Sequence, residues 1–186
     1  MADFTDRTVL LGISGGIAAY KSVELARLLV KRGARVKVVM TSSGSEFVSP
    51  LTFRTVTGNP VATSLWADPA SPFPHISLSE EADLLVVAPA TANIIAKYAS
   101  GIADDLLSTT LLAARGTVVF APSMNARMYM NPATQENLRI LRDRGVVIVD
   151  PGEGELACRE EGPGRMAEPA RIVEALESVL DRRLDL

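Results

Sequence analysis

The stretch Thr8–Ile13 (TVLLGI), followed by Ser14-Gly15-Gly16 and a helical pattern over residues 17–32, decides the fold. An apolar run of six residues is too short for a typical helix, and its continuous hydrophobicity indicates a strand buried on both faces. Gly33 stands where the helix is expected to end. The chain therefore opens with a buried strand that passes through a glycine-rich turn into a helix.

The same alternation continues to the end of the chain. Further short apolar runs cover residues 35–40, 84–88, 117–121 and 146–149, and helical patterns cover residues 92–100, 104–114, 134–144 and 169–181. This alternation predicts the α/β class, with a single doubly wound, Rossmann or flavodoxin-like parallel sheet covered by helices on both faces. Two long irregular stretches, residues 59–75 and 151–169, interrupt the alternation, and loops of this length are usually functional or disordered.

Composition limits the class of protein. The 186 residues fit one domain over residues 1–186, and 47% apolar and 22% charged residues are ordinary for a globular chain. The net charge of −3 argues against binding to nucleic acid, and no apolar run approaches the roughly 18 residues of a membrane span. The lone Cys158 excludes an intrachain disulfide and a thiolate metal cluster. With no basic segment before an apolar one at the N-terminus, we expect a soluble, cytoplasmic protein without a metal.

The first loop limits the kind of nucleotide that this fold would bind. A dinucleotide fingerprint counted from Gly12 needs glycines at Ser14 and Ile17, and a P-loop counted from Gly15 needs glycine at Tyr20. Residues 36–45 also lack the ribose-binding acid of a dinucleotide site before Glu46. A single phosphate, such as that of FMN, remains compatible with this loop, and so does a tight turn without a ligand.

Polar residues follow three other predicted strands. Thr41-Ser42-Ser43 places hydroxyls at the same sheet edge, although these residues also suit a helix N-cap. Thr91 and Asn93 either cap the next helix or face a planar heterocycle at the carboxyl edge of the sheet. Ser123-Met124-Asn125 ends the following strand, where the amide of Asn125 is well placed to hold a carboxylate.

Two further residues are candidates for proton transfer. His75, the only histidine, lies at a junction between a loop and the next element, where it is either a general base or a structural residue. Cys158 lies in a glycine-hinged segment beside arginines, where it can exchange protons, although a lone cysteine is usually an inert small apolar residue. We assign no chemistry to Asp104 and Asp105, because acids favour a helix start.

The chain resembles the homo-oligomeric flavin-containing cysteine decarboxylases. The motifs SGGIAAYK, His75-Ile-Ser-Leu, PATAN, APSMNARM and LACREEGPGRMAEP occur in the order seen in that family, over nearly the whole chain. Within the family, the motifs are most similar to those of the bacterial phosphopantothenoylcysteine decarboxylases. One departure is Arg159, where relatives usually carry glycine, and it affects the flexibility of the segment around Cys158.

The resemblance implies a bound FMN and a set of site residues. His75 and Cys158 match the catalytic residues of the family, and Asn125, Met124 and Arg165 match its substrate-binding segment. The residues that match its flavin contacts are Gly15, Gly16, Ile17, Thr41, Ser42, Ser43, Thr91, Ala92, Asn93, Ile94 and Ser123.

The resemblance also implies the reaction and the partners. In that reaction, oxidised flavin would remove a hydride from the carbon that bears sulfur, which gives a thioaldehyde that accepts the electrons as CO₂ leaves. Reduced flavin would then return the hydride to the resulting enethiol, and Cys158 would supply the proton. The expected substrate is the small molecule 4′-phosphopantothenoylcysteine, in coenzyme A synthesis. The expected partners are further copies of the chain, as a trimer or a dodecamer built from trimers, and a phosphopantothenate–cysteine ligase, fused or separate. The chain ends before a ligase domain could begin, so it resembles a stand-alone decarboxylase or an excised domain.

Three other functions are compatible with parts of the pattern. A peptidyl-cysteine decarboxylase of modified-peptide biosynthesis would stop at the enethiol, and would not need the proton donor Cys158. A flavin prenyltransferase would not need the cysteine segment either. A non-catalytic regulatory flavoprotein would not need His75, Asn125 and Cys158 together.

Overall fold

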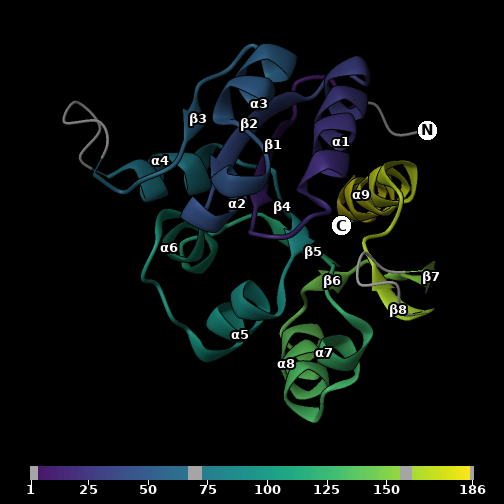
Figure 1. Ribbon diagram of the computed structural model, residues 1–186. Helices are drawn as coiled ribbons and strands as arrows, with labels where there is room; N and C mark the ends of the chain where they lie inside the picture. Colours follow the sequence, from purple (N-terminus) through teal and green to yellow (C-terminus); the bar gives the residue numbers. More distant parts are fainter. Residues whose placement is uncertain (1–3, 67–72, 156–160, 185–186) are drawn as a thin grey trace.

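The fold is organised by parallel strands that are buried on both faces. The computed structural model describes residues 4–66, 73–155 and 161–184, and within these ranges six parallel strands form one sheet in the order β3-β2-β1-β4-β5-β6 (Figure 1). This strand order and the parallel pairing confirm the predicted doubly wound α/β fold. The strands are β1 (Thr8–Ile13), β2 (Arg35–Met40), β3 (Val61–Ala62), β4 (Leu84–Ala90), β5 (Thr117–Pro122) and β6 (Val147–Ile148).

The central strand β4 shows how the two faces of the sheet are filled. All seven of its residues are buried. Leu84 and Val86 belong to the apolar core on one face, whereas Leu85 and Val87 belong to the core on the other face. Successive strand side chains point to opposite faces, so a strand between two helical layers must be apolar at every position.

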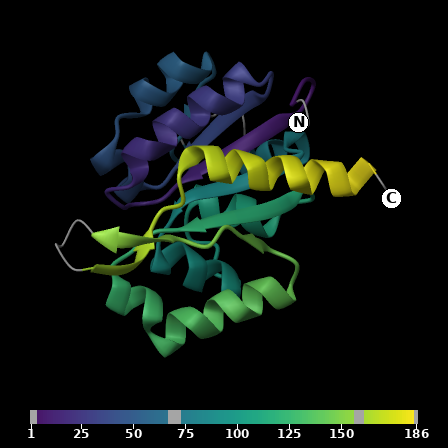
Figure 2. The same cartoon turned by 90° about the vertical axis from the view of Figure 1, so that its right-hand side faces the viewer.

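Helices cover both faces of the sheet. Helices α1, α3 and α9 contribute to the first core, and α5, α6 and α8 to the second (Figures 1 and 2). The helices are α1 (Ala19–Lys31), α2 (Ser42–Phe47), α3 (Pro50–Thr57), α4 (Pro74–Glu81), α5 (Ala92–Ser100), α6 (Leu106–Leu112), α7 (Ala126–Met130), α8 (Pro132–Asp143) and α9 (Pro169–Leu184). Within the described ranges, no helix combines the length and the apolar character that crossing a membrane requires.

The two irregular stretches contain short elements. Residues 59–75 include β3 and the first residues of α4. Residues 151–169 include an antiparallel pair, β7 (Gly152–Glu155) and β8 (Glu161–Arg165), which forms a separate two-stranded sheet. Strand β8 contacts α7, so this pair lies against the segment that follows β5.

Candidate functional site

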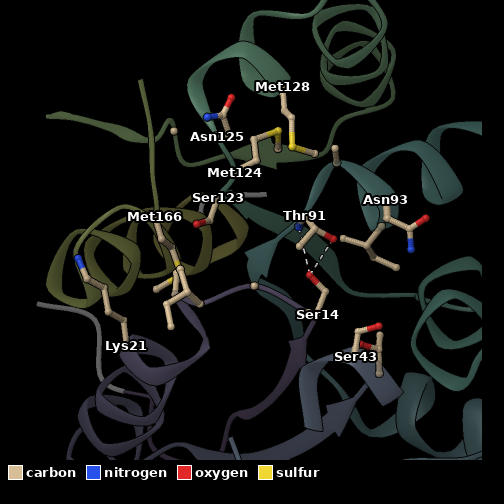
Figure 3. A pocket seen from close by; sticks show the side chains of 18 of the residues that line it. Ser14, Lys21, Ser43, Thr91, Asn93, Ser123, Met124, Asn125, Met128 and Met166 are labelled. Atoms are coloured by element: carbon tan, nitrogen blue, oxygen red, sulfur yellow. Dashed lines mark hydrogen bonds between the residues drawn. The ribbon is translucent and has the colours of Figure 1, made fainter. Parts of the chain in front are cut away.

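A cavity of about 890 Å³ opens at the carboxyl edge of the sheet. The segments that follow β1, β2, β4 and β5 all line it, as expected for a ligand site in an open parallel sheet. It brings together fourteen residues predicted from the sequence: Gly15, Gly16, Ile17, Thr41, Ser42, Ser43, Thr91, Ala92, Asn93, Ile94, Ser123, Met124, Asn125 and Arg165. In the close-up, Met124 and Asn125 lie on one side of the cavity and Ser43 on the opposite side (Figure 3).

The loop after β1 is packed directly against the loop after β2. A Cβ atom built at Gly15 would overlap the Cβ of Ser43, and it would lie 3.0 Å from the carbonyl carbon of that residue. The neighbouring Gly16 has no comparable contact, since its nearest neighbour would be a methyl group of Thr91 at 3.6 Å. Gly15 therefore allows two loops to approach each other, whereas Gly16 leaves open space at the cavity wall.

A buried serine connects the loops after β1 and β4. The hydroxyl of Ser14 donates a hydrogen bond to the carbonyl oxygen of Pro89 (2.7 Å) and accepts one from the backbone N–H of Thr91 (3.1 Å) (Figure 3). It also lies 3.2 Å from Oγ1 of Thr91. The side chain of Thr91 does not cap α5, although Thr91 is its N-cap residue. The sequence did not single out Ser14, because a serine in a glycine-rich turn gives no sign of its partner 75 positions away.

The hydroxyls after β2 serve partly as a helix cap. Oγ1 of Thr41 accepts a hydrogen bond from the backbone N–H of Gly44 (3.0 Å) at the start of α2. Thr41 also lines the cavity together with Ser42 and Ser43, so the two interpretations of this segment hold together.

The loop after β5 is held from two sides. The backbone N–H of Ser123 donates to the carbonyl oxygen of Ala90 (3.0 Å), and that of Met124 donates to the carbonyl oxygen of Gly164 in β8 (3.0 Å). Oδ1 of Asn125 accepts a hydrogen bond from the backbone N–H of Arg127 (2.8 Å), so this side chain caps the short helix α7. The Asn125 amide is thus oriented by a local hydrogen bond while it lines the cavity.

Of the two predicted proton-transfer residues, the structure describes only His75. His75 lies in the first turn of α4 and is not among the residues that line the cavity of its own chain. Its Nδ1 atom is buried and has no hydrogen-bond partner within the described part of the chain. Cys158 and Arg159 lie outside the described residues, so their predicted roles stay predictions.

Two clusters of charged residues at the cavity were not assigned from the sequence. Lys97 lines the cavity and forms ion pairs with Asp104 (2.6 Å) and Asp105 (2.9 Å). Burial lowers the pKa of Lys97, but the hydrogen bonds to the two carboxylates outweigh it and raise that pKa overall. Asp105 also lines the cavity, so its place at a helix start is only part of its environment.

The second cluster joins α1 to the start of α9. Nζ of Lys21 lies 2.7 Å from Oε1 of Glu168, and this hydrogen bond lowers the pKa of Glu168. The near match to a P-loop draws attention to Lys21, but its partner is 147 positions away and no local pattern identifies it.

Sequence comparison finds similarity to bacterial proteins that are named for coenzyme A biosynthesis. The "Coenzyme A biosynthesis bifunctional protein CoaBC" of Vibrio cholerae is 51% identical over 180 residues, which are 96% of this chain and 45% of the relative. The protein of the same name from Bacillus subtilis is 49% identical over 173 residues, which are 92% of this chain and 43% of the relative. The chain thus spans less than half the length of these relatives.

Solved structures and a family model agree with this comparison. A cysteine-to-serine mutant of PPC decarboxylase, complexed with pantothenoylaminoethenethiol, has a TM-score of 0.84 and 32% identity, covering 94% of this chain and 98% of that one. The FMN-dependent cysteine decarboxylase SpaF has a TM-score of 0.85 and 33% identity, covering 96% of this chain and 98% of that one. The family model "Flavoprotein" matches residues 2–181. With its doubly wound sheet and its cavity at the strand ends, the chain belongs to the flavoprotein family.

Proposed function

We propose that this chain is an FMN-dependent decarboxylase that converts 4′-phosphopantothenoylcysteine into 4′-phosphopantetheine. The observation that carries the proposal is the cavity, which brings the predicted flavin-contact residues and the Asn125 loop together at one sheet edge. The sequence identity of about 50% to bifunctional proteins of coenzyme A synthesis supports this choice of substrate. The similarity to a PPC decarboxylase bound to an enethiol supports the reaction class.

The residues at the first two loops fit a flavin mononucleotide. Gly16 leaves open space at the cavity wall, and Ser42 and Ser43 supply hydroxyls and backbone N–H groups beside it. These neutral donors suit one phosphate, and no acid follows β2 before Glu46 to bind a dinucleotide ribose. When bound, FMN would supply reversible two-electron oxidation of the substrate carbon that bears sulfur.

The remaining roles belong to side chains of this protein. Asn125 would hold the substrate carboxylate by its amide, which avoids the repulsion that an acidic side chain would exert. His75 would assist thiol oxidation or orient the substrate before CO₂ is lost, and Cys158 would donate the proton that completes the product.

The position of His75 supports an oligomeric enzyme. Because His75 does not line the cavity of its own chain, we propose that a second copy of the chain brings it to the cavity, within a trimer or a multiple of trimers. The relatives are named bifunctional and are more than twice as long as this chain. A phosphopantothenate–cysteine ligase, fused or separate, is the partner that would supply the substrate.

A second candidate is a peptidyl-cysteine decarboxylase. The FMN-dependent cysteine decarboxylase TvaF, named for thioviridamide biosynthesis, is 30% identical with a TM-score of 0.74, so the fold also suits an enzyme of modified-peptide synthesis. The presence of Cys158 favours the complete reductive cycle, because an enzyme that releases an enethiol needs no second proton donor.

The test is a comparison of two substrates. Purified protein loaded with FMN is incubated with 4′-phosphopantothenoylcysteine and, separately, with a peptide that ends in cysteine, and products are identified by mass. We expect 4′-phosphopantetheine from the first substrate and no reaction with the peptide. Release of CO₂ from the peptide alone would replace the proposal by the second candidate, and release from neither would refute both.

The variant Cys158→Ser tests the order of steps. Since a hydroxyl is a far poorer acid than a thiol, we expect CO₂ release to persist and an enethiol, lighter than the product by two hydrogen atoms, to accumulate together with reduced flavin, which retains the two electrons. His75→Asn and Asn125→Asp should both abolish CO₂ release. Normal product from Cys158→Ser at an unchanged rate would show that the cysteine is structural.

A further inference from the structure

Among the residues that the structure describes, three basic side chains line the cavity, and two of them are paired with carboxylates. Lys97 is paired with both Asp104 and Asp105, and Lys21 is paired with Glu168. The side chains of Lys97 and Lys21 are only 16% and 14% exposed. The carboxylates therefore offset the positive charges of Lys97 and Lys21, which weakens the attraction of these two side chains for an anionic ligand.

Arg165 is the third basic side chain, and it differs from the other two. Within residues 4–66, 73–155 and 161–184, it forms no ion pair with a carboxylate, although its charge contributes to the lowered pKa of Glu168. Arg165 is exposed to solvent and lines the cavity. Arg165 thus supplies an uncompensated positive charge on the cavity wall.

The position of the Arg165 side chain is built into the β7–β8 pair. A Cβ atom at Gly154, whose φ is +134°, would lie 3.2 Å from Nη1 of Arg165 and 3.7 Å from its Cδ. The absence of a side chain at Gly154 therefore leaves room for the arginine to lie across β7.

Strand β8 is in turn fixed against the loop that carries Asn125. Gly164, with φ of +137°, accepts a hydrogen bond from the N–H of Met124, and a Cβ atom there would overlap the carbonyl oxygen of Met124. Arg165 and Asn125 therefore line the same cavity from two segments that are joined through backbone. The cofactor loops, with Ser43, lie on the opposite side of the cavity (Figure 3).

The proposed substrate carries two anionic groups, a carboxylate and a terminal phosphate. Asn125 provides a neutral amide for the carboxylate, and the loops after β1 and β2 provide neutral donors for the cofactor phosphate. We propose that Arg165 binds the terminal phosphate of the substrate and thereby selects the phosphorylated over the dephosphorylated substrate. This inference rests on the proposed function. A guanidinium suits this role because its planar fork donates two parallel hydrogen bonds to phosphate oxygens.

The experiment compares one variant on two substrates. The values of kcat/KM for CO₂ release are measured for wild type and Arg165→Gln with 4′-phosphopantothenoylcysteine and with pantothenoylcysteine, which lacks the phosphate. Loss of a charged hydrogen bond predicts a decrease of about 10- to 100-fold for the phosphorylated substrate. We expect less than about a twofold change for pantothenoylcysteine, because it has no partner for Arg165.

Two further variants separate this role from general effects. Arg171→Gln removes the same charge from an exposed position in α9 outside the cavity, and both substrates should react as with wild type. Arg165→Lys keeps the charge but loses the planar fork, and should recover part of the preference for the phosphorylated substrate. The FMN content of each variant is measured by absorbance, and we expect it to equal that of wild type.

Several results would overturn the inference. An equal loss with both substrates would place Arg165 on the carboxylate or in the packing of β7 and β8. A loss of FMN from Arg165→Gln would place it on the cofactor phosphate. Wild-type protein that releases CO₂ from neither substrate would refute the proposed function, and the inference with it, whereas an active wild type whose Arg165→Gln variant keeps the full preference for the phosphorylated substrate would refute the inference alone.

Discussion

Two adjacent glycines in the first loop face different surroundings. The Cα of Gly15 lies against the backbone and Cβ of Ser43, so any side chain there would push apart the loops after β1 and β2. Gly16 faces open space, with no atom within 3.6 Å of an added Cβ. Packing within the protein therefore requires glycine at position 15, whereas it does not require glycine at position 16.

This difference predicts that alanine substitutions at the two positions change the free energy of unfolding by different amounts. Gly15→Ala should lower the free energy of unfolding by about 1–3 kcal/mol, the usual cost of overpacking a site that cannot relax. Gly16→Ala should leave it within about 0.5 kcal/mol of wild type, because the methyl group makes only ordinary van der Waals contacts, the nearest at 3.6 Å from Thr91. Urea denaturation of the two FMN-free variants measures both values. Equal destabilisation of the two variants would contradict the conclusion that only Gly15 is required for packing.

The glycines and hydroxyls of the site could be predicted from the sequence because each follows a strand. Parallel strands end at one edge of a sheet, so residues such as Ser43, Thr91 and Ser123 must meet there once the strands are identified. The partners of Ser14 and Lys21 could not be predicted, because Pro89 and Glu168 are distant in sequence and no periodic pattern connects them. The sequence thus predicted which of these residues lie at the sheet edge, but it did not predict the hydrogen-bond and ion-pair partners of Ser14 and Lys21.

Helix α6 depends on the residue that precedes it. Asp105 is the N-cap and forms a capping box, in which its Oδ1 accepts from the backbone N–H of Ser108 (2.8 Å) and Oγ of Ser108 accepts from the N–H of Asp105 (3.1 Å). Burial raises the pKa of Asp105, but the hydrogen bonds from Ser108 and Lys97 outweigh it and leave that pKa below its ordinary value. The ionised carboxylate therefore stabilises the folded state.

Asp105→Ala should lower the free energy of unfolding by about 1–2 kcal/mol near neutral pH. Because the folded-state pKa is the lower one, this contribution is present above the unfolded pKa and is lost as pH falls through the folded pKa. The difference in the free energy of unfolding between wild type and Asp105→Ala should therefore disappear at acidic pH. Thermal denaturation measured over a range of pH values tests this. Asp104→Ala, which removes a 58% exposed partner of Lys97, should cost less than about 1 kcal/mol; an equal cost would contradict the capping role.

Long apolar or periodic segments allowed most elements to be predicted. Residues 8–13, 35–40 and 92–100 form elements with the expected bounds. The sequence did not reveal α3, α4 or the β7–β8 pair, because these elements are short, and α3 and α4 begin with proline while β7 begins with glycine. Such elements are stabilised by contacts with the rest of the fold rather than by a periodic apolar face of their own.

At the scale of the whole molecule, apolar side chains remain exposed around the cavity. Ile17 and Tyr20, at the start of α1, are 57% and 60% exposed, and both line the cavity. Met128 in α7 is 49% exposed and also lines the cavity. Apolar groups that gather near a functional site in this way are typical of an interface between subunits.

We therefore expect a homo-oligomer with the cavity near a subunit interface. Light scattering at micromolar concentration should give three times the 19.8 kDa mass of the chain, or a multiple of that trimer. Tyr20→Glu should shift the mass toward the monomer, because a charge would be buried at the contact. Glu24→Lys, at a half-exposed α1 position ion-paired with Arg27, serves as the comparison. An active monomer would refute the expectation.

If a neighbouring copy supplies His75, two inactive variants should restore each other. His75→Asn leaves the cavity and Asn125 intact, whereas Asn125→Asp leaves His75 intact, so an oligomer assembled from both chains contains sites with one intact residue from each. Random assembly from equal amounts should complete about a quarter of the sites, and CO₂ release should reach about that fraction of the wild-type rate. The double variant, mixed with Asn125→Asp in the same way, lacks a chain with intact Asn125 and should stay inactive. Mixed oligomers that bind FMN but release no CO₂ would show that His75 acts within its own chain, and that the cavity of a single copy must then change shape to reach it.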